Sequence, residues 1–153
     1  MIAMVSEVAL RRGYVAFLEA LRGRGFEGEI APDYANRTVL ATDNSIYQRL
    51  PQAAVYPKHA EDLESLSRLA AQATHRGIVL TPRGGGTGTN GQSLTDGIVV
   101  DVSRHMNKII EIDTENHRVR VQAGVVKDQL NAALKPHGLF FAPELSTSNR
   151  ATI

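Results

Sequence analysis

A cluster of glycines lies near the middle of the chain, in the stretch TPRGGGTGTNGQS from Thr81 to Ser93. Five glycines fall between Gly84 and Gly91, and only small polar residues separate them. Glycine loses more backbone entropy on folding than any other residue, so such a concentration indicates a loop that a ligand or another backbone approaches closely.

Spacing decides which phosphate-binding motif this loop can form. The range Gly86–Gly91 matches G-x-G-x-x-G, and with the next two residues it comes within one residue of G-x-x-x-x-G-K-[ST]. Both motifs need a helix directly after the loop, but only the six residues 92–97 separate it from the next apolar run. The spacing therefore argues against a Rossmann fingerprint and against a nucleoside triphosphate loop.

The remaining interpretation is a nest, in which successive backbone N–H groups bind an anion without a helix. The first three glycines would permit the required backbone angles, and Arg83, Thr87 and Thr89 could add donors. A flexible turn between two strands is the alternative.

Other residue types with catalytic potential lack the spacing that chemistry requires. No two histidines lie two to four positions apart, so no metal site is expected. They are His59, His75, His105, His117 and His137. The acidic residues of 61–64 fit the first turns of a helix, where the helix dipole favours negative charge. No G-x-S-x-G motif is present.

Apolar periodicity and turn residues predict the elements that position the loop. These are helices at 6–22, 60–75 and 126–135, strands at 53–56, 98–102, 109–112 and 119–122, and an apolar run at 78–80 that enters the glycine loop. Gly77 is expected to end the second helix, TENH (114–117) is expected to form a hairpin turn, and 139–153 is strand-like and then polar. The order predicts an α+β fold with a βαβ unit at its centre.

Composition limits the classes of partner. A formal net charge of +1 and an aromatic content of 5% do not favour nucleic-acid binding. The chain has no cysteine, which excludes disulfides and cysteine-ligated clusters within it. No apolar stretch approaches the length of a membrane span, so we expect a soluble protein, placed in the cytoplasm.

Five ordered motifs resemble one family of flavoproteins. They are YPKHAEDL, GIVLTPRGGGTGTNGQS, GIVVDVSRHMNKIIEID, VRVQAGV and HGLFFAPELSTSNRATI. Together they resemble the FAD-binding domain of the vanillyl-alcohol oxidase and p-cresol methylhydroxylase superfamily, especially its 2-hydroxy-acid dehydrogenase branch. ATDNSIYQRLPQAAVYP is similar to large bacterial members that carry an iron–sulfur module. The resemblance implies the first part of the FAD-binding domain at 37–153, which leaves 1–36 as an N-terminal helical extension and loop.

The resemblance also implies the cofactor and its binding residues. In the family, the arginine–glycine loop wraps the FAD pyrophosphate. Carried over by position, the cofactor-binding residues are Pro57, Pro82, Arg83, Gly84, Gly85, Gly86, Thr87, Gly88, Thr89, Asn90, Gly91, Pro143, Ser146, Thr147 and Thr152. Some members attach FAD through a histidine where this chain has Thr87, so binding here should be non-covalent. His59 stands where a serine-like helix cap is usual, which implies a modest loss of stability.

The implied activity is hydride transfer to FAD from a 2-hydroxy acid such as D-lactate, glycolate or D-2-hydroxyglutarate. The family's TIGG motif is cut after Ile153, so we expect a C-terminally truncated fragment that is inactive alone and has no catalytic residue. The substrate domain and any iron–sulfur cluster would lie beyond it. The alternative is a non-catalytic interaction or regulatory module derived from such an enzyme.

Overall fold

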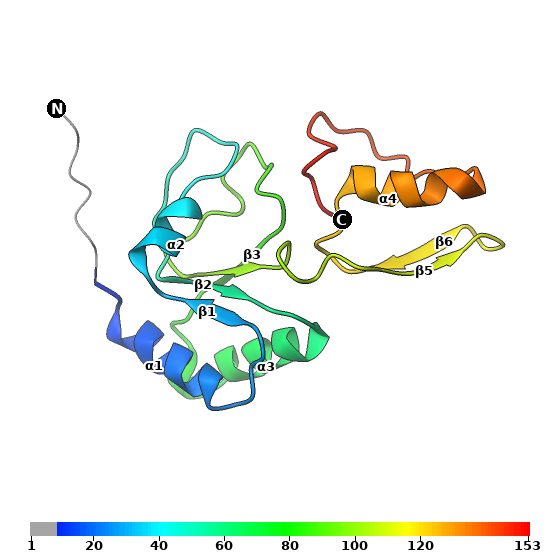
Figure 1. Cartoon of the computed structure of the whole chain (residues 1–153). Helices are drawn as coiled ribbons and strands as arrows, with labels where there is room; N and C mark the ends of the chain where they lie inside the picture. Colours follow the sequence, from blue (N-terminus) through cyan, green and yellow to red (C-terminus); the bar gives the residue numbers. More distant parts are fainter. Residues whose placement is uncertain (1–8) are drawn as a thin grey trace.

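The computed structural model describes residues 9–153 and arranges them in two lobes (Figure 1). The helices are α1 (Arg12–Arg22), α2 (Tyr34–Val39), α3 (Ala60–Ala70) and α4 (Lys127–Leu134), with 3-10 turns at Ala73–His75 and Lys135–His137. The strands are β1 (Glu29–Ala31), β2 (Ala53–Tyr56), β3 (Leu80–Arg83), β4 (Ile98–Asp101), β5 (Ile109–Asp113) and β6 (Arg118–Val121). Within residues 9–153, no helix is both long and apolar enough to cross a membrane.

The larger lobe is built on a four-stranded sheet with the order β1-β2-β4-β3. β2 and β3 both run parallel to β4, whereas β1 pairs antiparallel with β2. The α3 helix connects β2 to β3, so the predicted βαβ unit is present, with β4 inserted between its strands. The carboxyl ends of three parallel strands therefore meet at one edge, the edge where ligands bind in open parallel sheets.

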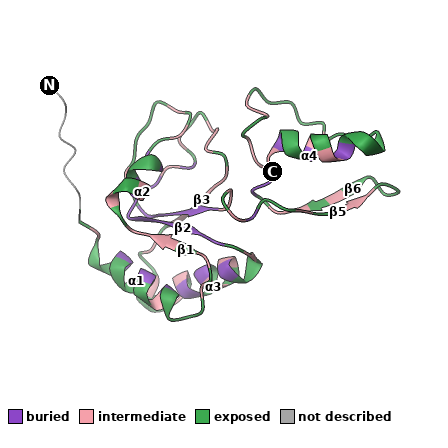
Figure 2. Ribbon diagram, in the orientation of Figure 1, coloured by how far each residue is buried: buried purple, intermediate pink, exposed green. Residues whose placement is uncertain are grey.

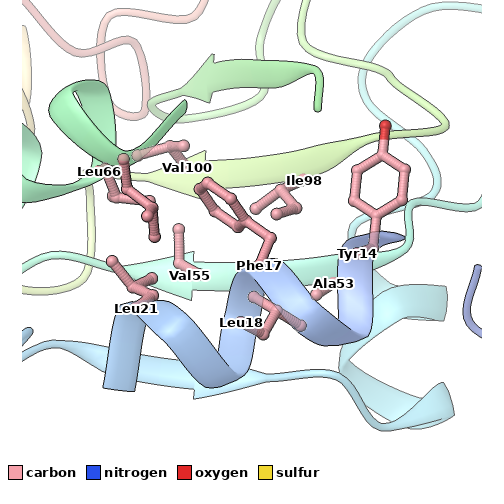
Figure 3. Packing of buried hydrophobic residues seen from close by; sticks show 10 residues of the cluster. Tyr14, Phe17, Leu18, Leu21, Ala53, Val55, Leu66, Ile98 and Val100 are labelled. Atoms are coloured by element: carbon pink, nitrogen blue, oxygen red, sulfur yellow. The ribbon is translucent and has the colours of Figure 1, made fainter. Parts of the chain in front are cut away.

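The central strands of this sheet carry apolar side chains on both faces, and each face packs against helical segments. Ala53, Val55, Ile98 and Val100 face α1 and α3, and α1 contributes Phe17 (Figure 3). Figure 2 shows the buried residues of α1 and α3 on the sides of those helices that face the sheet. The opposite face packs Ala54, Tyr56 and Val99 against Leu40 at the end of α2. Continuous apolar strands of this kind are typical of parallel sheets between helical layers.

The smaller lobe consists of the β5–β6 hairpin and α4. Leu130 and Leu134 of α4, with Val125, form a separate core with the inward side chains of the hairpin. The hairpin turn forms as predicted: Asn116 N donates to Asp113 Oδ1 at 3.0 Å, and His117 has a φ of 52°. Gly138 ends the helical segment in the left-handed conformation.

The N-terminal part differs most from the prediction. The helix predicted at 6–22 begins at Arg12, and its first three predicted residues, 6–8, lie outside the described residues. The segment 28–52, for which the sequence predicted neither helix nor strand, contains β1 and α2.

Two further boundaries differ. The helix predicted at 60–75 ends at Ala70 and is followed by a 3-10 turn, so Gly77 does not end it. The segment 139–153 contains no strand and makes one isolated bridge, between Val126 and Thr152.

The start of α3 lacks a conventional side-chain cap. His59 occupies the capping position without a side-chain hydrogen bond to the backbone. The buried carboxylate of Asp62 instead accepts from the backbone N–H groups of Lys58 and Glu27, each at 2.8 Å. Asp62 therefore fixes the residue before the capping position and also the connection before β1.

Candidate functional site

The glycine loop leaves the carboxyl end of β3 and returns to β4. Arg83 is the last residue of β3, and its carbonyl accepts from Val102 N at 3.0 Å. Gly86 and Gly91 then take positive φ values of 64° and 72°, which glycine adopts at low steric cost. Among the described residues, none accepts a hydrogen bond from the backbone N–H groups of 85–88. The loop therefore presents unpaired donors, as a nest requires.

The C-terminal segment lies directly against this loop. A Cβ atom at Gly84 would overlap Thr152 Oγ1, and one at Gly85 would overlap the carbonyl oxygen of Arg150. These two glycines thus allow a side chain and a backbone carbonyl of the C-terminal segment to approach, whereas the sequence pattern predicted a phosphate in this space.

Backbone hydrogen bonds to the start of α4 hold this segment in place. Lys127 N donates to Ala151 O at 2.9 Å, and Ile153 N donates to Val125 O at 3.0 Å. The side chain of Ser148 adds a bond to Asp128 Oδ2 at 3.1 Å. The smaller lobe therefore positions the segment that contacts the glycine loop.

Two hollows flank the contact between Gly85 and Arg150, and both residues line each of them. The first has a volume of about 340 Å³, and its other lining residues are Ser103, Asn107, Gly124, Val126, Gln129, Asn149 and Thr152. The second has a volume of about 270 Å³, and its other lining residues are Val39, Thr42, Asp43, Asn44, Arg83, Gly86, Thr87 and Thr147. An elongated ligand with an anionic centre could occupy both hollows and cross at the glycine loop.

The charges around the second hollow favour an anion. Arg83 and Arg150 line it together with a single carboxylate, that of Asp43. Burial alone would raise the pKa of Asp43, but hydrogen bonds from Ser45 and Ser93 and the charge of Arg83 outweigh this effect and lower it. The carboxylate is therefore ionised at neutral pH, and two guanidinium groups leave an excess of positive charge.

The side chain of Arg83 points into a segment that the sequence analysis left without a role. Its Nη2 atom donates to the carbonyl of Thr42 at 2.9 Å, and its Nη1 atom donates to Ser93 Oγ at 3.3 Å. Residues 42–44 of this segment line the second hollow. In the sequence, these residues belong to ATDNSIYQRLPQAAVYP, a stretch that resembles family members, but no local pattern linked them to Arg83.

The remaining predicted residues are spread over the surroundings. Thr147 and Thr152 each line one of the two hollows. Asn90 and Gly91 line a third hollow with Tyr47. Seven predicted residues line neither of the first two hollows: Pro57, Pro82, Gly84, Gly88, Thr89, Pro143 and Ser146. Pro57 is buried directly after β2. The structure thus gathers Arg83, Gly85, Gly86, Thr87, Thr147 and Thr152 around one centre.

The described residues 9–153 contain no group of three or more His, Cys, Asp or Glu side chains placed to hold an ion. Two of the histidines contact carboxylates. His59 Nε2 lies 3.2 Å from Glu27 Oε2, and His105 Nε2 lies 2.6 Å from Glu29 Oε1.

Comparison with known proteins identifies relatives of this arrangement. The family model described as "FAD binding domain" matches residues 51–153. D-2-hydroxyglutarate dehydrogenase of Pseudomonas putida is 70% identical over the whole chain, and that of Escherichia coli is 56% identical over 98% of it. The chain spans 15% of the length of each of these two relatives. Glycolate oxidase subunit GlcD of Bacillus subtilis is 34% identical over 70% of the chain, which covers 22% of that protein.

Solved structures share the fold. Alkyldihydroxyacetonephosphate synthase superposes on 99% of the chain with a TM-score of 0.79 at 20% identity, and 30% of that protein is covered. p-Cresol methylhydroxylase superposes on 94% with a TM-score of 0.67 at 17% identity, and 28% of it is covered. The fold class expected from the sequence is confirmed.

Proposed function

Because the chain belongs to the FAD binding domain family, we propose that it is the part of a flavin-dependent oxidoreductase that holds FAD non-covalently along the glycine loop. The whole-chain similarity to D-2-hydroxyglutarate dehydrogenases supports a 2-hydroxy acid as the substrate of the larger protein, with D-2-hydroxyglutarate as the first choice. A cytoplasmic location, expected from the sequence, is part of the proposal.

One observation carries this proposal: the loop presents unpaired backbone N–H groups between two hollows. The N–H groups of 85–88 have no acceptor among the described residues. The hollows on either side meet at Gly85 and Arg150. A dinucleotide has this shape, with a diphosphate at its centre and a bulky group at each end. The residues present therefore fit FAD.

Different residues of the chain would bind different parts of FAD. The loop N–H groups and the guanidinium of Arg150 would hold the diphosphate, because charge-assisted hydrogen bonds to phosphate oxygens are stronger than hydrogen bonds between neutral groups. Thr87 offers a hydroxyl and no imidazole, which supports non-covalent attachment. When bound, FAD supplies the hydride acceptor that oxidation of a 2-hydroxy acid requires.

Flavin titration of the purified chain tests the proposal. The chain is mixed with excess FAD, desalted, and examined for visible flavin absorption. A retained band that acid precipitation releases would support non-covalent binding at this site. A colourless protein that still unfolds cooperatively would overturn the proposal in favour of an interaction module. Bleaching by D-2-hydroxyglutarate is expected only in a longer protein that carries this chain.

A further inference from the structure

Two segments far apart in sequence are joined at the glycine loop. The backbone N–H of Asn44 donates to Gly86 O at 3.1 Å, and Arg83 donates to the carbonyl of Thr42 at 2.9 Å. The segment 41–49 has its own closure, because Arg49 N donates to Ala41 O at 2.8 Å. The glycine loop therefore rests on a closed neighbouring loop.

The guanidinium of Arg83 packs against Gly86 in the glycine loop that follows this residue. A Cβ atom at Gly86 would stand only 2.5 Å from Arg83 Nη2 and 2.9 Å from its Cζ. Gly86 also has a φ of 64°, which disfavours any other residue. The guanidinium therefore occupies the space that a side chain at position 86 would need.

Asp43 reaches this guanidinium through a buried hydroxyl. Ser93 Oγ donates to Asp43 Oδ2 at 3.0 Å and lies 3.3 Å from Arg83 Nη1. Ser93 is only 8% exposed, so water competes little for these bonds. The other carboxylate oxygen of Asp43 accepts from Ser45 N at 2.8 Å, which fixes the carboxylate in its orientation.

We propose that Asp43 is a positioning residue that acts through Ser93 and Arg83 to hold the glycine loop in its binding shape before the cofactor arrives. The inference rests on the proposed function, because it assigns the loop's shape to FAD binding. In this inference, the side chain of Arg83 supports the loop, and the carboxylate of Asp43, 40 positions earlier in the sequence, holds that side chain in place. Preorganisation of this kind lowers the cost of ordering a loop on binding.

Substitutions at Asp43 and Ser93 separate charge from hydrogen bonding. Asp43→Ala removes both, Asp43→Asn keeps the shape and the acceptor for Ser45 N, and Ser93→Ala removes the relay. Asp96→Asn is the matched control, since Asp96 pairs with Arg11 at 2.9 Å but precedes the opposite end of β4. The readouts are FAD affinity, amide hydrogen exchange at Asn44, and the Arg83 side-chain signals in nitrogen-15 spectra without ligand.

Asp43→Ala and Ser93→Ala should each weaken FAD binding about tenfold or more, and they should speed exchange at Asn44 and mobilise the Arg83 side chain. Asp43→Asn should restore much of the Asn44 protection, and Asp96→Asn should match the wild type. Wild-type affinity and unchanged Arg83 signals in Asp43→Ala would overturn the inference. If no variant binds FAD, including the wild type, but Asp43→Ala still mobilises Arg83, the proposed function fails and the hold of Asp43 on the loop stands.

Discussion

At the scale of single residues, the glycines of the loop serve different neighbours. Gly84 and Gly85 admit the C-terminal segment, while Gly86 admits the guanidinium of the chain's own arginine. At Gly88, a side chain would meet the amide group of Gln92. Each position therefore excludes a side chain for a separate steric reason, and substitutions there should have separable effects.

Replacing Gly85 with alanine should displace the segment at Arg150 and weaken FAD binding. The added methyl would overlap a backbone carbonyl, which cannot rotate away as a side chain can. We expect the free energy of unfolding to fall by about 1–3 kcal/mol, as for other overpacked sites. Chemical denaturation and flavin titration measure the two effects.

Gly13→Ala is the control, because a Cβ atom at Gly13 meets nothing within 4 Å. Its position in α1 should make alanine neutral or up to about 1 kcal/mol stabilising. Equal losses in both variants would contradict the steric explanation.

His59 should make stability depend on pH. Its pKa is raised above 6.5, chiefly by the hydrogen bond to Glu27, with Asp62 and Glu61 adding negative charge. Since the folded-state pKa is the higher one, this contribution is complete below about pH 6.5 and disappears as the pH rises through the folded-state pKa. His59→Gln should flatten the thermal midpoint between about pH 5 and pH 8. Glu27→Gln should do the same, and a retained slope in both variants would refute the assignment.

At the scale of elements, α4 links the hairpin to the glycine loop. Its inner side packs on β5 and β6, and its first residues bind the C-terminal segment that contacts the loop. Loosening α4 should therefore affect the loop although no residue of the loop is changed.

Leu130→Ala should be the severe substitution in this lobe. Leu130 is 1% exposed, and removing such a side chain leaves a cavity that costs about 2–5 kcal/mol. Ile110→Ala, in the same lobe but 57% exposed at its surface, should stay within about 0.5 kcal/mol of the wild type. Thermal and urea unfolding compare the two. If both variants lose less than about 0.5 kcal/mol of unfolding free energy, the lobe contributes little to cooperative stability.

The elements also show what sequence patterns can predict. The strands at Ala53–Tyr56, Ile98–Asp101 and Arg118–Val121 agree with prediction to within one residue at each end, because turn residues bound their apolar runs. β1 and α2 were missed because three and six residues are too short to establish a period.

The site shows the same limit. Its glycine cluster is local and was recognised, but the partners of Arg83 are a carbonyl 41 positions away and a serine on the far side of the loop. The contact of Gly85 with Arg150 likewise joins residues from different lobes. Such pairings follow from the tertiary fold, and no local pattern encodes them.

At the scale of the whole molecule, the site depends on both lobes at once. The sheet supplies the glycine loop, and the smaller lobe supplies the segment around Arg150. A ligand that crosses this contact should therefore tie the lobes together.

FAD at about one hundred times its dissociation constant should stabilise the chain by about 2.7 kcal/mol, through mass action on the folded state. Differential scanning fluorimetry would be confounded by the flavin, so calorimetry or circular dichroism should follow the melt. Riboflavin, which lacks the diphosphate, should give little shift. An equal shift with riboflavin would place the binding energy outside the glycine loop.

The position of β4 has a consequence for the order of folding. It follows β2 and β3 in the chain yet lies between them, so the central place in the sheet stays vacant until the residues of β4 have been synthesised. Until then, β2 pairs only with β1, β3 has no partner strand, and the glycine loop has no second anchor. The non-local pairing that slows folding is thus the same pairing that shapes the loop. On the proposed function, FAD would therefore bind only after the sheet has assembled, and a chain released before Asp101 would carry every glycine of the loop without a complete site.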